Sequence, residues 1–237
     1  MPSGAAAPII AAMKKPLCST LLVLASLLPC GAGAAVLQLT VHGADGKPAA
    51  DTVVLWRRTG GFQPFSRSDT VVIAQRDIRF VPAVVVVPVQ GTVRFVNKDR
   101  FDHHVRSMPG GPLGSVPPHT SFEFRLAKAS GGQEPSAELK FEATGPLAVG
   151  CHLHGSMRAH IYVSPTPWAA VSDDKGRATL DVPDGPGELV LWHPDQVVEQ
   201  SPRTLQAAGA SDVTQALNFT PRRRAPPRTP AKGEYEY

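Results

Sequence analysis

The sequence predicts an all-β protein, built as a sandwich of short antiparallel strands. In several short segments apolar residues recur at every second position, which is the period of a half-buried strand. The 24 prolines and 21 glycines divide the chain into short runs. No segment carries the apolar stripe that an amphipathic helix of three turns would need.

The first predicted strands lie before residue 100. Apolar and polar residues alternate over 36–42, and the turn sequence that follows leads into a second strand over 52–58. Residues 59–69 show no period and are interpreted as a loop. The apolar run within 80–97 is bracketed by two prolines and ends in an alternating strand that includes Asn97.

The remaining elements continue this pattern. Residues 99–119 are interpreted as a loop, and 122–127 as a strand of period two. A surface loop is expected over 129–138. The segment 139–163 then predicts a strand, a turn, a loop and a second strand, and 169–194 predicts two more strands.

The N-terminus has the pattern of an export signal. Two lysines precede an apolar run over 16–30, and small residues follow as far as Ala34. The run is shorter than the roughly 20 residues of a membrane-spanning helix. We therefore expect a signal peptide over 1–34 and a periplasmic mature chain without an integral membrane segment. Lipid anchoring at Cys30 is less favoured, because Pro29 occupies a position where a small residue is expected.

Charge gives little information about partners. The formal net charge is +4, and much of the basic excess lies in the arginine-rich tail after residue 220. The folded part is therefore close to neutral, which gives no indication of nucleic-acid binding. The last 17 residues are expected to be disordered.

Cys151 is the one cysteine that remains after removal of the predicted signal, which contains Cys18 and Cys30. No internal disulfide can then form. A lone cysteine in an oxidising compartment is an inert core residue, a residue prone to oxidation or a metal ligand. The residue types around it in the sequence indicate which of these roles it has.

The segment 151–157 places Cys151, His154 and Met157 three residues apart in a short loop. A further ligand is expected from His103 or its neighbour His104, after the strand that ends at Asn97. Two histidines, one cysteine and a weak axial methionine form the ligand set of a blue-copper site. Zinc is less favoured, since structural zinc sites usually have more cysteines. The alternatives are an inert cysteine and a methionine that only fills the core.

These motifs resemble the cupredoxin superfamily. The string GTVRFVNKDRFDHHV, followed about fifty residues later by GCHLHGSM, is similar to the ligand segments of that family, and the short loop is similar to that of amicyanin. The resemblance implies that His103 is the first histidine ligand, with His104 as the alternative. It also implies that Asn97 braces the cysteine sulfur. The order of motifs over 37–194 resembles exported plastocyanin-like proteins of the methylamine utilization type.

The flanking segments resemble a second unit. Residues 36–58 and 166–198 look like the two halves of a carboxypeptidase-regulatory-like, or transthyretin-like, β-sandwich. A cupredoxin-type Greek-key sandwich over 69–165 would then be inserted between them, or joined to them, and 199–237 would form a C-terminal extension.

The resemblance implies an electron carrier with one type 1 copper ion and a protein redox partner, a cytochrome or a dehydrogenase. We do not expect an enzyme, because the related copper enzymes place a histidine before the cysteine, where this chain has Gly150. The alternatives are a periplasmic protein for copper carriage and a non-redox β-sandwich binding module. His152 is expected on the surface.

Overall fold

A computed structural model describes Gly4 and residues 33–59, 69–110 and 116–222. Apart from Gly4, Gly33 and Ala34, the predicted signal peptide lies outside the described residues, as does the tail after residue 222. All the regular elements among the described residues are strands, so the all-β prediction is confirmed. In this part of the chain there is no helix of the length and hydrophobicity that crossing a membrane requires.

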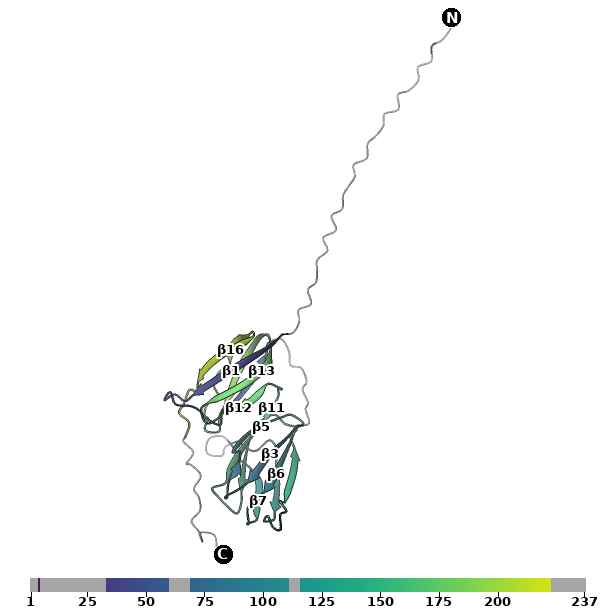
Figure 1. The fold of residues 1–237 in the computed structure, drawn as a ribbon, viewed down its shortest axis with the longest axis vertical. Coiled ribbons are helices and arrows are strands. Elements are labelled where there is room, and N and C mark those ends of the chain that lie inside the picture. The colour runs from purple at the N-terminus through teal and green to yellow at the C-terminus, as the bar shows by residue number, and fades with distance from the viewer. Residues whose placement is uncertain (1–3, 5–32, 60–68, 111–115, 223–237) are drawn as a thin grey trace. The chain divides into compact units, whose positions relative to one another are not determined.

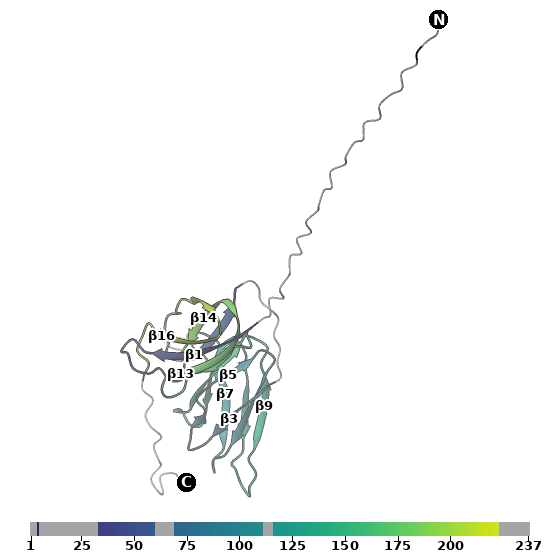
Figure 2. The same ribbon diagram turned by 45° about the horizontal axis from the view of Figure 1, so that its top comes forward.

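One sandwich is formed by the middle of the chain. Its five-stranded sheet has the order β5 (Val84–Pro88), β11 (Arg158–Ser164), β10 (Gly145–Cys151), β7 (His103–Met108) and β8 (Glu123–Leu126). Its four-stranded sheet has the order β4 (Phe80–Val81), β3 (Thr70–Gln75), β6 (Thr92–Asn97) and β9 (Ser136–Lys140). The chain passes from one sheet to the other between β5 and β6 and returns at β7, as in a Greek-key sandwich. Figure 2 labels β3 and β9 of the four-stranded sheet and β5 and β7 of the five-stranded sheet.

A continuous apolar core fills the space between these two sheets. Ile73 and Phe95 come from the four-stranded sheet, and Val105, Val149 and Ile161 come from the five-stranded sheet. All five side chains are fully buried. In much of β10 and β11 these buried residues alternate with less buried ones, which is the period-two pattern of a strand with one face in the core.

A second sandwich is formed by the two ends of the described chain. One sheet has the order β13 (Arg177–Pro183), β1 (Ala34–His42) and β16 (Ala210–Ala216), which lie side by side in Figure 1. The other has the order β12 (Ala169–Val171), β2 (Val53–Arg58), β14 (Gly185–Trp192) and β15 (Arg203–Ala207). Leu37, Trp56 and Leu189 lie in its core. The division into an inserted and a flanking domain remains our interpretation of these two cores.

The structure differs from the sequence prediction at several places. No strand is predicted over Thr70–Gln75, which forms β3, and β9 begins at Ser136, inside the loop expected over 129–138. Residues 103–108, expected within a loop, form β7, because His103 and Val105 point into the core although histidine is a weak strand signal. The second sandwich also continues past the predicted boundary at residue 198. There β15 pairs with β14, and β16 pairs in parallel with β1.

Candidate metal centre

Two neighbouring strands and one loop bring the predicted ligands together. His103 is the first residue of β7, and Cys151 is the last residue of β10, where it pairs with Val105. The loop 151–157 then folds back on itself, because the Met157 N–H donates to the carbonyl of His154 at 3.0 Å. This turn directs the His154 ring toward Cys151.

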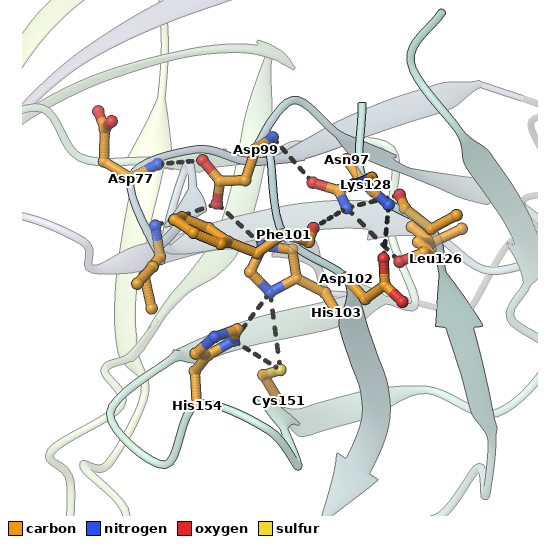
Figure 3. A network of polar contacts seen from close by, with 12 residues as sticks. Asp77, Asn97, Asp99, Phe101, Asp102, His103, Leu126, Lys128, Cys151 and His154 are labelled. Carbon is orange, nitrogen blue, oxygen red and sulfur yellow. Dashed lines mark hydrogen bonds and ion pairs between the residues drawn. The ribbon is translucent and has the colours of Figure 1, made fainter. Parts of the chain in front are cut away.

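Three ligand atoms form a compact triangle (Figure 3). The Cys151 Sγ lies 3.7 Å from Nδ1 of His103 and 3.5 Å from Nδ1 of His154, and the two nitrogens are 3.2 Å apart. His103 and Cys151 are buried, and His154 is partly exposed. In the described part of the chain, this is the one group of three or more such residues whose ligand atoms lie close enough to share an ion.

The triangle has the dimensions of a trigonal metal site. A metal about 2.0 Å from each imidazole nitrogen and about 2.3 Å from a thiolate, with ligand angles of about 105–120°, requires N···N separations of about 3.2–3.5 Å. The corresponding S···N separations are about 3.4–3.7 Å. The observed distances fall within these ranges, and one soft thiolate with two imidazoles is a donor set that suits copper.

Met157 lies at the end of the ligand loop. Its side chain is 1% exposed and belongs, with Cys151, to the apolar core of the sandwich. This position suits a weak axial ligand, since a thioether is uncharged and can be buried at little cost. Its role as a ligand stays a prediction.

Asp99 is the functional residue that sequence reasoning missed. The Nε2–H of His103 donates to Oδ2 of Asp99 at 2.9 Å, with both side chains buried (Figure 3). The same carboxylate accepts the backbone N–H groups of Asp77 at 2.7 Å and Ile78 at 3.1 Å. The carboxylate therefore holds the proton on Nε2 and leaves Nδ1 of His103 available to a metal. An aspartate four residues before the histidine was the available signal.

The surroundings of His103 and Cys151 shift the pKa values of both side chains. Burial opposes both charges, but the hydrogen bond to Asp99 and the contact with Cys151 outweigh it and raise the pKa of His103 to about 9. Burial on its own would raise the pKa of the Cys151 thiol. The contacts with His103 and His154 and the backbone N–H groups outweigh this effect and lower the pKa to about 6. At neutral pH these pKa shifts favour a Cys151 thiolate beside a protonated His103. Asp99 holds the proton on Nε2, so a metal has to displace only the proton on Nδ1.

We expect the ultraviolet thiolate absorbance of the metal-free protein to rise with a midpoint near pH 6, because His103 stabilises the thiolate. The measurement uses a background in which Cys18 and Cys30 are serine, so that Cys151 is the only thiol. The same chain in denaturant provides the control, with a midpoint near the ordinary value of about 8.5. Equal midpoints for the folded and denatured chain would show that the predicted ion pair does not form.

Asn97 has a different role from the predicted one. Its Nδ2 donates to the carbonyls of Phe101 and Ala127, each at 2.7 Å, and its Oδ1 accepts the N–H of Asp99 at 2.8 Å. The two closest contacts engage both amide protons, so the side chain has none to offer the Cys151 sulfur. Asn97 instead closes the turn that carries Asp99 and leads into His103 (Figure 3).

The two histidines adjacent to the ligands point elsewhere. Because side chains alternate along a strand, His104 of β7 lies on the face opposite His103, where its Nε2 is 2.9 Å from Oε1 of Glu123. The ring of His152 lies next to that of His104, with 5.6 Å between the ring centroids. His152 is exposed, as expected, and His104 contributes no atom to the triangle.

Comparison with known proteins gives distant likenesses. No protein-family model and no curated protein matches the chain. A Cu(I) form of an amicyanin mutant matches with a TM-score of 0.32 and 20% identity, over 40% of this chain and 82% of that one. The amicyanin of Paracoccus versutus gives 0.32 and 20%, over 46% and 97%. A copper-containing nitrite reductase from Thermus scotoductus gives 0.33 and 22%, over 43% and 25%. Because these TM-scores and identities are low, the similar structures carry no argument about the chemistry of the site, which follows from the residues of the site itself.

Proposed function

We propose that this protein is an exported cupredoxin-type electron carrier that binds one copper ion at His103, Cys151, His154 and Met157. The observation that carries the proposal is the triangle of two imidazole nitrogens and one cysteine sulfur, at 3.2–3.7 Å from one another. Bound copper would supply the one-electron chemistry, alternating between Cu(II) and Cu(I). The softness of the sulfur and the borderline imidazoles suit both oxidation states.

The residues around the triangle support electron transfer because they limit rearrangement. His103 is fixed by Asp99, and Cys151 is fixed by its position at the end of a paired strand. His154 rests against Phe101, with 6.4 Å between the ring centroids. A ligand set held in this way changes little between two oxidation states, so little energy is spent on reorganisation.

His154 is the ligand best placed to face a partner. It is the one member of the triangle that is partly exposed, and the neighbouring Leu153 is 51% exposed. We propose a cytochrome or a dehydrogenase as the redox partner, and the periplasm as the compartment, on the basis of the export signal in the sequence. We also propose a carrier rather than an enzyme.

The test is a visible absorption spectrum of the Cys18→Ser, Cys30→Ser background, metal-free and after one equivalent of Cu(II). We expect an intense thiolate-to-copper band that bleaches on addition of ascorbate and returns on oxidation. A colourless product that still binds copper would favour copper carriage. A product that binds no copper would leave a β-sandwich binding module.

A further inference from the structure

A second group of side chains of the types that bind metals lies on the outer face of the same sheet, although in the structure their ligand atoms are not all close enough to share an ion. In β7 the alternation that turns His103 inward turns His104 outward. Opposite it, the His152 N–H donates to the His104 carbonyl at 2.8 Å, which continues the pairing of β10 with β7 by one residue. His104 and His152 are therefore direct cross-strand neighbours on one face, a position in which side chains meet.

Glu123 completes this cluster. It is the first residue of β8, and it pairs with Arg106, two residues beyond His104 on the same face of β7. The Oε1 of Glu123 lies 2.9 Å from Nε2 of His104. Two ligand atoms about 2.0–2.1 Å from one metal, at right angles to each other, are about 2.9 Å apart, so this pair already has the spacing of neighbouring ligands.

The spacing of the two outer histidine rings can be compared with that of the two histidine rings in the inner site. His103 and His154, which form the inner triangle, have ring centroids 4.9 Å apart and an interplanar angle of 61°. His104 and His152 have centroids 5.6 Å apart and an angle of 72°. The centroids of the outer rings are thus 0.7 Å further apart. The outer group therefore needs a side-chain rotation of the exposed His152 to bring its ring nitrogen within reach of the other two ligands.

We propose that His104, His152 and Glu123 form a second, outer metal site for a divalent transition-metal ion. Two imidazoles and one carboxylate suit Cu(II) and Zn(II), and Cu(II) is the tighter-binding of the two by the general affinity order. The side chains of His104 and Glu123 are 29% and 55% exposed, so an ion can reach them from solvent. Arg125, the nearby cation on β8, is paired with Asp102.

The outer site is joined directly to the inner one. His104 follows His103, and His152 follows Cys151, so a single peptide bond connects an outer ligand with an inner ligand on each of two strands. An ion bound to the His152 ring is therefore joined to the Cys151 thiolate by a covalent path through one peptide bond. Its binding is expected to shift the inner absorption band without removing any inner ligand.

The test is a metal titration of the full chain in the Cys18→Ser, Cys30→Ser background. After one equivalent of Cu(II) has filled the inner site, a second equivalent is followed by electron paramagnetic resonance. We expect two coppers per chain, the second with the signal of an ordinary tetragonal Cu(II) bound by nitrogen and oxygen. His152→Ala and Glu123→Gln should each lower the affinity for the second Cu(II) ion by at least about tenfold. His119→Ala, which removes an exposed histidine outside both clusters, should leave it unchanged.

A single copper per chain, or an undiminished second equivalent in His152→Ala, would overturn the proposal. A second measurement, Zn(II) binding to Cys151→Ser, tests the outer site independently of the electron-carrier proposal. That variant lacks the inner thiolate, so its Zn(II) affinity does not depend on a working type 1 copper site. We expect Cys151→Ser to bind Zn(II) and the Cys151→Ser, His152→Ala double variant to bind it at least about tenfold more weakly. Equal binding by these two variants would also overturn the outer site.

Discussion

Replacement of Cys151 with serine is expected to abolish the intense visible band completely and to leave the all-β fold intact. The band requires a thiolate, and a hydroxyl does not ionise at neutral pH, so His103 and His154 would remain as a weak two-nitrogen site. The serine hydroxyl would be buried. The two Nδ1 atoms lie 3.7 and 3.5 Å from the sulfur that it replaces, so a small side-chain shift would give it a hydrogen-bond partner. The free energy of unfolding of the metal-free protein should therefore fall by only about 1 kcal/mol.

The measurement pairs the visible spectrum with far-ultraviolet circular dichroism and a denaturant titration of each chain. The control is the Cys18→Ser, Cys30→Ser background, which carries the same kind of substitution at the two cysteines of the predicted signal. Retention of an intense band in Cys151→Ser would refute the assignment of the sulfur ligand. Loss of the β-sheet signal from the metal-free variant would mean that Cys151 is needed for folding, which the structure does not lead us to expect.

The sequence predicted most of the strands whose inward positions are aliphatic; β3 is an exception, since no element is predicted over Thr70–Gln75. In β1 the alternation of Leu37, Leu39 and Val41 with polar residues matches their burial. The alternation of apolar and polar residues did not reveal β7, because one of its inward positions is His103. A histidine counts as a polar residue in such a pattern, even where it is buried. The alternation also gave no clear boundary at β15 and β16, since those short strands are held mainly by backbone pairing with β14 and β1.

The candidate site could be predicted only as far as ligand identity. Thiolate, imidazole and thioether at fixed spacing indicate a metal from chemistry alone. The choice between His103 and His104 depends on which face of β7 each occupies, and the segment had been interpreted as a loop. Asp99 and the outer cluster depend on register across strands, because β7, β8 and β10 meet only after folding.

Replacement of Asp99 with asparagine is expected to weaken Cu(II) binding on the order of 10–100-fold. The Asp99 carboxylate accepts three N–H groups, from His103, Asp77 and Ile78. An asparagine amide offers one oxygen, so its NH₂ group must face at least one of those donors. If it faces His103, the imidazole proton is driven to Nδ1, the atom that should bind the metal. If it faces Asp77, that N–H loses its acceptor, at a cost of about 1–3 kcal/mol in the free energy of unfolding.

Asp102→Asn is the matched control, because it removes one negative charge beside His103 but lies in an exposed pair with Arg125. Copper affinity and unfolding are measured for both variants by competition with a chelator and by denaturant titration. Asp99→Asn should also lower the pKa of His103 from its value of about 9, since the Asp99 hydrogen bond helps to raise it. Equal losses of copper affinity in the two variants would mean that long-range charge, and not the Asp99–His103 hydrogen bond, prepares the site. A loss confined to Asp99→Asn would show that the Asp99–His103 hydrogen bond prepares the site. The carboxylate keeps a proton on Nε2, so that Nδ1 is the nitrogen that gives up its proton to copper.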